Sequence, residues 1–120
     1  MTDGMKERAQ ELGRLLGQSD EYKALSRARE RLTDDRAAIA AMNRLDALEH
    51  EVGVALHSGQ EPPDQVKNEY EQLFSQLQAL PAYQGVIAAQ SNFDKLLARV
   101  NEEISRGMEA GAQSRIILPS

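Results

Sequence analysis

The sequence predicts an all-α protein, folded as a long helical hairpin with a short N-terminal helix. Strong helix formers such as Ala, Leu, Glu, Gln and Arg are frequent, while aromatic residues make up only 4% of the chain. Apolar residues recur at steps of three and four along most of the chain, which is the period of a helix with one buried face. A chain of 120 residues is expected to form a single domain, over residues 1–110, followed by a flexible tail over 111–120.

The first predicted helix covers about residues 3–16. Its apolar positions are spaced by four, three and four, so they share one face; they are Met5, Ala9, Leu12 and Leu16. Gly17 suits the left-handed conformation that ends many helices. Ser19 can accept a hydrogen bond from the first free amides of the next helix. The chain is therefore expected to turn at residues 17–19.

The second predicted helix runs from Asp20 to about Ser58 without a helix-breaking residue, a rod of roughly 55–60 Å. The gap in its apolar pattern at Asp35 and Arg36 is expected to weaken the stripe only locally. Gly53 lies inside the rod, where it marks either a close helix crossing or a tolerated surface position. The apolar positions are Tyr22, Leu25, Ala28, Leu32, Ile39, Met42, Leu45, Leu48, Val52 and Leu56.

Two further helices are predicted after the loop that contains Gly59, Pro62 and Pro63. We interpret this loop as a corner, because Gly59 can close the long helix and the two prolines restrict the chain before it returns. The third helix covers about residues 64–79 and is ended by Pro81, since proline disfavours the helical state in the residue before it. The fourth covers about residues 83–108, where Gly107 begins to fray it. One face of it is spaced like a short coiled-coil seam, with Val86, Gln90, Phe93, Leu97, Val100 and Ile104.

The lengths of these helices predict how they assemble. The third and fourth helices together are about as long as the second, so they should fold back along it. Such a thin hairpin leaves apolar surface uncovered, and we expect a homodimer in which the rods of two chains complete a common bundle core. The residues expected to contact the second copy or another protein are Leu25, Leu32, Ile39, Met42, Phe74, Phe93 and Leu97.

Charge and cysteine content restrict the function further. Fourteen basic and nineteen acidic residues give a net charge of −5, which disfavours nucleic acid as the default partner. The absence of cysteine excludes disulfides, thiolate chemistry and cysteine-ligated zinc or iron–sulfur clusters. No run of apolar residues approaches the roughly 20 that cross a bilayer, and the charged N-terminus lacks the apolar segment of a signal peptide. A cytoplasmic protein without membrane insertion is expected.

No arrangement of residues in the sequence indicates a catalytic site, a cofactor or a small-molecule substrate. His50 and His57 share a helix face but lie about 10 Å apart along its axis, too far for one metal ion. We interpret them as surface histidines, since a metal site would need ligands from another helix or another copy. The adjacent acids Asp34 and Asp35 diverge around a helix and cannot work as an acid–base pair. We therefore expect no enzyme.

Arginines gather in the second predicted helix, at Arg27, Arg29, Arg31 and Arg36. They could contact RNA phosphates or the acidic face of a partner protein. The alternative is a solvated face of ion pairs, each contributing only a few tenths of a kcal/mol. Arg27 is spaced to pair with Glu30. Arg31 is spaced to pair with Asp34 or Asp35. The solvated face is the favoured interpretation.

Four segments follow one another in an order that is typical of a known family. They are LGQSDEYKAL, LTDDRAAIAAM, GQEPPDQV and YEQLFSQLQALPAYQGVIAAQSNFDKLLARVNEEIS. The most specific positions are Ser19 and Tyr22, which open the long helix, the acidic pair at residues 34–35, the corner at residues 59–63, and Pro81. Over about residues 5–106 the chain resembles the YlbF/YmcA family of small bacterial helical regulatory proteins, and it is closest in type to the YheA branch.

The resemblance implies an all-helical, dimeric protein without known enzymatic activity. Better-studied members act as regulatory partners in a complex that affects RNA processing by a membrane-tethered endoribonuclease, and they influence competence, sporulation and biofilm formation. Those members are associated with iron–sulfur clusters held by cysteines. This feature does not carry over to a chain without cysteine.

Two functions are left by these observations. The first is a non-enzymatic regulatory or scaffolding protein that acts through protein–protein interaction, as the excess of amphipathic helix without site chemistry indicates. The alternative is an RNA-binding accessory factor that uses the arginine-rich face of the long helix. RNA binding that weakens steeply as salt rises would favour the second function over the first.

Overall fold

The computed structural model describes the backbone of residues 1–117 and the side chains of residues 1–113. This part of the chain is all-helical, as the sequence predicts, and contains no strand. The helices are α1 (Asp3–Gly17), α2 (Asp20–Asp34), α3 (Arg36–His57), α4 (Asp64–Ala79) and α5 (Pro81–Ile117).

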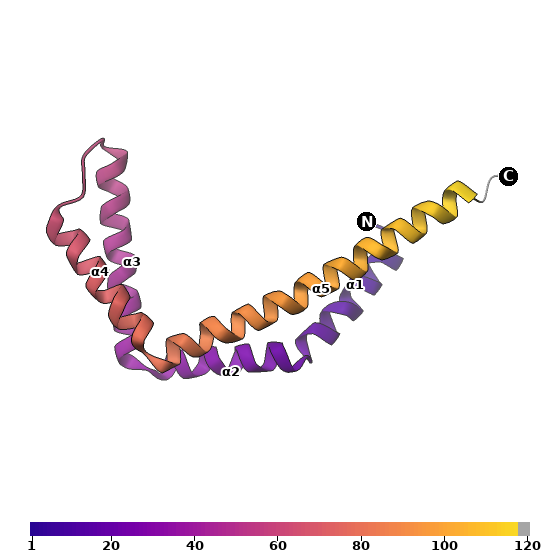
Figure 1. Ribbon diagram of the computed structural model, residues 1–120, viewed down its shortest axis with the longest axis horizontal. Coiled ribbons are helices and arrows are strands. Elements are labelled where there is room, and N and C mark those ends of the chain that lie inside the picture. Colours follow the sequence, from indigo (N-terminus) through magenta and orange to yellow (C-terminus); the bar gives the residue numbers. More distant parts are fainter. Residues whose placement is uncertain (118–120) are drawn as a thin grey trace.

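The helices form two arms that meet at a bend (Figure 1). α3 and α4 lie antiparallel in the short arm, whereas α2 packs along the first part of α5 in the long arm and α1 continues toward the far end of that arm. The molecule measures 71 × 38 × 22 Å, with a radius of gyration of 21.9 Å. A compact domain of this length has about 14 Å. The chain is therefore extended, and large parts of its helices have no neighbour.

The single helix expected over residues 20–58 is wrong, because the chain breaks at Asp35 into α2 and α3. Asp35 adopts an extended conformation, with φ −87° and ψ 101°. Its carboxylate accepts a hydrogen bond from the Ala38 amide at 3.1 Å, so it serves as the N-cap of α3. In the returning half of the hairpin, Leu80 is also extended, with ψ 126°, and Pro81 starts α5. Both halves of the hairpin are thus interrupted near the same point, and the hairpin bends there (Figure 1).

The last helix also differs from expectation, since α5 starts at Pro81 and continues to Ile117 instead of covering residues 83–108. Proline is accommodated at the first helical position, where the amide has no helical partner to lose. Gly107 and Gly111 lie within the helix, at a cost of about 1 kcal/mol each relative to alanine. The helix takes in most of the segment expected as a tail, of which residues 118–120 lie outside the described residues.

Local capping rules account for the other helix ends. Ser19 caps α2 as predicted, since its hydroxyl accepts a hydrogen bond from the Tyr22 amide at 3.1 Å and donates one to the Leu16 carbonyl at 2.6 Å. The expectation of a left-handed cap at Gly17 is wrong, because this residue ends α1 without a positive φ. The left-handed glycine of the described chain is Gly59, with φ 76°, which confirms its predicted role in closing α3.

Two small clusters of buried apolar side chains hold the arms together. The first lies at the bend and contains Leu32, Ala38, Leu45 and Leu77. The second lies between α2 and α5 and contains Leu25, Ala28 and Ala89, with Phe93 packed against them. No polar side chain is buried among those described. α1 buries none of its residues, and α5 is exposed throughout residues 101–113, so the far end of the long arm has little cover.

Candidate interaction surfaces

Six apolar residues at the far end of the long arm are exposed or only partly covered, and we call them the distal stripe. They are Met5, Leu12 and Leu15 of α1 and Val100, Ile104 and Met108 of α5. The exposed fractions of the four most open residues range from 45% for Ile104 to 69% for Met108. Leu12, Val100 and Ile104 line one shallow hollow, so α1 and α5 lie near each other at these three residues.

The distal stripe exists because the apolar seam of α5 extends past the helix that covers it. From Phe93 the seam continues through Leu97 and Val100 to Ile104 at helical spacing. α2 starts only at Asp20, and α1, which precedes it, buries none of its own residues. The apolar seam of α5 is therefore less buried beyond the N-terminus of α2, where α1 follows as the neighbouring helix.

The residues predicted to contact a second copy or a partner lie at different depths. Leu25 and Leu32 are 1% and 8% exposed and pack inside the chain. Phe93 is half-buried, and its ring meets that of Tyr22 edge-on, with centroids 5.5 Å apart. Phe74 is exposed at the surface of α4. The remaining three, Ile39, Met42 and Leu97, are half-buried. The sequence pattern located the seam, but the exposure of each position depends on where the neighbouring helix ends.

The four arginines of the predicted RNA-binding face do not form one patch. The Arg29 guanidinium donates a hydrogen bond to Gln90 Oε1 of α5 at 3.1 Å. Arg27 and Arg31, spaced by four, share a different flank of α2, and Arg36 lies beyond the break, in α3. All four are exposed.

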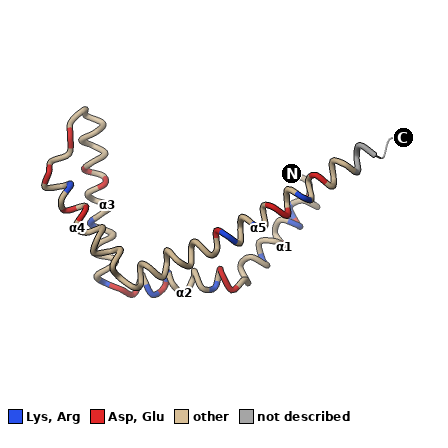
Figure 2. Tube along the Cα trace, in the orientation of Figure 1, with Lys and Arg blue, Asp and Glu red and all other residues tan. Residues whose placement is uncertain are grey.

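The ion pairs expected for these arginines are not formed. Neither Arg27 nor Arg31 has a carboxylate within 4.0 Å; the ion pairs among the described side chains are Arg8–Glu11, Arg44–Glu69 and Arg106–Glu103. Both acidic and basic residues nevertheless occur along α2 (Figure 2). The face is therefore of mixed charge, which is a poor match to a phosphate backbone.

The two histidines lie where the sequence places them, on the exposed side of α3. His50 and His57 border a shallow surface hollow together with Glu49, Gly53 and Val54. Among the described side chains, no group of three or more His, Cys, Asp or Glu residues gathers closely enough to hold a metal ion. An added Cβ at Gly53 would meet no atom within 4 Å, so this glycine marks a surface position and not a close helix crossing.

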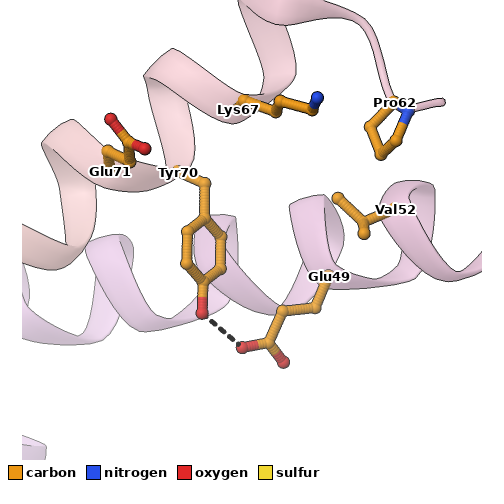
Figure 3. Close-up of a pocket in the computed structure, with 6 residues that line it drawn as sticks. All are labelled: Glu49, Val52, Pro62, Lys67, Tyr70 and Glu71. Atoms are coloured by element: carbon orange, nitrogen blue, oxygen red, sulfur yellow. Dashed lines mark hydrogen bonds between the residues drawn. The ribbon is translucent and has the colours of Figure 1, made fainter.

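A cavity of about 360 Å³ lies at the free end of the short arm, between α3, α4 and the loop that joins them, and we call it the tip cavity (Figure 3). Its apolar walls come from Val52 of α3, Pro62 of the loop and the ring of Tyr70 of α4. Its polar lining is Glu49, Lys67 and Glu71. The sequence drew attention to the loop but gave no sign of the cavity, because its existence depends on how far α3 and α4 diverge toward the loop.

A hydrogen bond joins the two helices at the edge of the tip cavity. The Tyr70 hydroxyl donates to Glu49 Oε1 at 3.2 Å (Figure 3). This hydrogen bond and partial burial, together with the nearby carboxylate charge, raise the pKa of the Tyr70 phenol. The ring of Tyr70 also stacks on Phe74, with centroids 6.1 Å apart. The aromatic wall of the cavity is therefore held from both the polar and the apolar end of the tyrosine.

A bidentate ion pair also joins the two helices of the short arm. Arg44 Nε and Nη2 donate to the two carboxylate oxygens of Glu69 at 2.7 and 3.0 Å. The hydrogen bond lowers the pKa of the Glu69 carboxyl and raises that of the Arg44 guanidinium. Both side chains are partly open to water, so the pair fixes geometry more than it adds stability.

The net negative charge of the protein is concentrated in the short arm. Between residues 46 and 71 the chain carries seven acidic residues and one basic residue, whereas the rest of the chain carries twelve acidic and thirteen basic residues. Figure 2 shows the contrast, with red segments on the middle of α3, on the loop and on α4. The acidic residues are Asp46, Glu49, Glu51, Glu61, Asp64, Glu69 and Glu71, and the basic one is Lys67.

Comparison with known proteins gives one match. A family model described as "Control of competence regulator ComK, YlbF/YmcA" matches residues 5–109, which is most of the chain. No curated protein and no solved structure matches the chain. Within the part of the chain that the structure describes, no helix combines the length and the apolar composition that a membrane crossing requires.

Proposed function

The chain belongs to the YlbF/YmcA family, and from this premise we propose that it is a regulatory or scaffolding protein that works as a homodimer and binds another protein, without catalysing a reaction. The family description, control of the competence regulator ComK, supports this class of process. Within the family we place the chain nearest the YheA type. A chain without cysteine lacks the ligands for the iron–sulfur clusters that other members are associated with. The proposed site of action is the cytoplasm.

The distal stripe is the observation that carries the dimer in this proposal. Its large apolar side chains lie on two helices at one end of the molecule, where none of the other described helices covers them. Complete burial of a large apolar side chain contributes roughly 1.5–3 kcal/mol, so the stripe favours a partner of the same apolar kind. A second copy offers the same stripe, and two such helix pairs packed together form a four-helix bundle.

A regulatory role through contact is supported over RNA binding by the distribution of charge. The arginine-bearing helix α2 also carries acidic residues, and the four arginines do not share one face, since Arg29 lies on another flank than Arg27 and Arg31. The largest excess of charge in the chain is negative, and it lies on the short arm. A nucleic acid would be repelled by this arm and would find no continuous basic face on the other.

The dimer is tested by a matched pair of substitutions on α5. Ile104 lies in the distal stripe, and Ile87 is similarly exposed, at 53%, but lies on another part of the helix. Light scattering at micromolar concentration should give twice the chain mass of 13.3 kDa for the wild type and for Ile87→Glu, and the chain mass for Ile104→Glu. Circular dichroism shows whether both variants remain helical. A monomeric wild type would remove the dimer from the proposal.

The regulatory role is tested in the organism that carries the gene. Deletion of the gene should change the transcript levels of genes that the competence regulator controls. A copy encoding Ile87→Glu should restore them, and one encoding Ile104→Glu should not, at equal protein levels. Unchanged transcripts in the deletion strain would contradict the proposed role.

A further inference from the structure

We propose that the tip cavity is the docking site for a basic segment of a partner protein, in which one large apolar side chain stands between lysines or arginines. This inference rests on the proposed function, in that it assigns the chemistry of the partner that a regulatory protein would bind. It concerns the opposite end of the molecule from the distal stripe (Figure 1).

The cavity supplies the apolar half of this recognition. Val52, Pro62 and the ring of Tyr70 face one another across a volume of about 360 Å³, at the lower end of the range of ligand pockets (Figure 3). The cavity is open on one side, so a side chain can enter it from a chain that passes over the surface. Interfaces often depend on one such anchor, an aromatic or large aliphatic side chain that fills a pocket on the other protein.

The rim supplies the electrostatic half. Glu49 and Glu71 line the cavity from opposite helices, against the single ammonium of Lys67. Asp46 lies three residues before Glu49, and Asp64 lies seven residues before Glu71, so both acids share a helix flank with a rim residue. A segment with basic residues on either side of its anchor therefore meets carboxylates on both sides of the cavity.

The same charges argue against other occupants. A second copy of this chain cannot dock tip to tip, because the tips carry the same excess of negative charge. The rest of the chain carries thirteen basic and twelve acidic residues, and the arginines of α2 do not gather on one face, so another copy offers the tip only weak charge complementarity. Acidic segments and nucleic acids are repelled. A basic segment of a different protein is the occupant that fits both the apolar wall and the charge.

The absence of tryptophan from the chain allows a direct test. The probe is the capped peptide Lys-Arg-Trp-Lys-Arg, whose tryptophan is excited at wavelengths that the tyrosines of the chain do not absorb, so the fluorescence reports only on the peptide. We expect a saturable blue shift on addition of the full chain, with an affinity that falls as salt rises. The same peptide with Ala in place of Trp should compete at least tenfold more weakly, because it lacks the anchor. The capped peptide Glu-Asp-Trp-Glu-Asp should not bind.

Two variants separate the cavity from the charge. Val52→Phe fills the cavity and leaves the charge unchanged, and it should abolish the blue shift and weaken binding at least tenfold. Glu49→Gln with Glu71→Gln should weaken binding about three- to tenfold at low salt. The matched control is Glu102→Gln with Glu109→Gln, which removes the same charge from the exposed far part of α5 and should change the affinity less than twofold.

Four results would overturn the inference. They are equal competition by the Ala peptide, undiminished binding to Val52→Phe, equal weakening by the control pair, and loss of the dimer in the tip variants, which would make the tip an interface between copies. Failure of the inference is distinguishable from failure of the proposed function, because the dimer and the transcript levels are measured with Ile104→Glu and Ile87→Glu, which leave the tip cavity intact.

Discussion

Two glycines of the same segment should respond to alanine with opposite changes in stability. Gly59 closes α3 in a left-handed conformation, with φ 76°. Its amide donates to the Leu56 carbonyl at 3.1 Å, and the amide of Gln60 donates to the Ala55 carbonyl at 2.9 Å. These are the two hydrogen bonds of a Schellman motif, which depends on a residue that tolerates positive φ. An alanine in this conformation costs roughly 1–2 kcal/mol.

Gly53, six residues earlier, is inside α3 and exposed, and a Cβ built there meets nothing within 4 Å. Alanine at this position should stabilise the chain by roughly 0.5–1 kcal/mol, because it restricts the unfolded chain and favours helix. The two substitutions add the same methyl group. They should therefore differ in free energy of unfolding by about 1.5–3 kcal/mol, with opposite signs relative to the wild type.

The assay is urea and thermal unfolding followed by circular dichroism, at equal chain concentrations, since the proposed dimer would make the midpoint depend on concentration. For a chain of this size, 1 kcal/mol corresponds to about 3–6 °C in midpoint. Gly59→Asn is the control, because asparagine tolerates the left-handed region and should lose less than Gly59→Ala. If Gly59→Ala proved neutral or stabilising, the left-handed closure of α3 would be refuted, and with it the geometry of the loop that walls the tip cavity.

Four other perturbations test separate parts of the fold. Leu25→Ala should lower the free energy of unfolding by about 2–5 kcal/mol, because this side chain is buried between α2 and α5, whereas Leu15→Ala should change it by less than about 0.5 kcal/mol once dimer formation is accounted for. The hydrogen bond from Arg44 lowers the folded-state pKa of Glu69, so the ion pair stabilises the fold above the usual carboxyl pKa, and this stabilisation is lost as pH falls. Glu69→Gln should therefore reduce the free energy of unfolding at about pH 7 and leave it unchanged near pH 2.5. Urea unfolding at both pH values measures the difference. Asp35→Ala removes the cap of α3 and should cost about 1 kcal/mol with the bend retained. In the Ile104→Glu background, which is expected to be monomeric, small-angle scattering should give the same radius of gyration with and without Asp35→Ala, close to the 21.9 Å of the single chain. A clearly larger value with Asp35→Ala would show that the cap, not the cluster at the bend, keeps the arms at an angle. A gel-shift series with single-stranded RNA should show no complex even at low salt, and a complex that dissociates steeply with salt would favour the RNA-binding alternative.

Apolar periodicity and helix-breaking residues were enough to predict most of the helices. Ser19, Gly59 and Pro81 each act through one backbone rule, which holds whatever packs around them. The break at Asp35 was missed because aspartate is tolerated within a helix as well as favoured at its start. Packing at the bend, where the nearby Ala38 is fully buried, supports Asp35 as the N-cap of α3. Such a contact between distant segments cannot be seen in a local pattern.

The interaction surfaces also differ in how much of each could be predicted from the sequence. The excess of acid between residues 46 and 71 is present in the sequence and needs only counting. The tip cavity is not, because Glu49 and Tyr70 belong to different helices, and their hydrogen bond depends on the register of α3 against α4. The distal stripe is an intermediate case, since most of its members lie on predicted apolar faces, whereas Leu15 and Met108 do not, and the exposure of its members depends on where α2 ends.

The bend determines how the two surfaces relate. It directs the short arm away from the far half of α5, so the tip cavity and the distal stripe lie at opposite ends of a molecule 71 Å long (Figure 1). A dimer joined through its distal stripes would leave both tips free and hold them at a separation determined by the long arms. A partner with two basic segments, or two partner molecules in one complex, would then meet a bivalent surface, and the second contact would form at the effective concentration set by the first. A straight hairpin with the same residues would lack this geometry, since its tip would lie on the axis of the arm that forms the dimer.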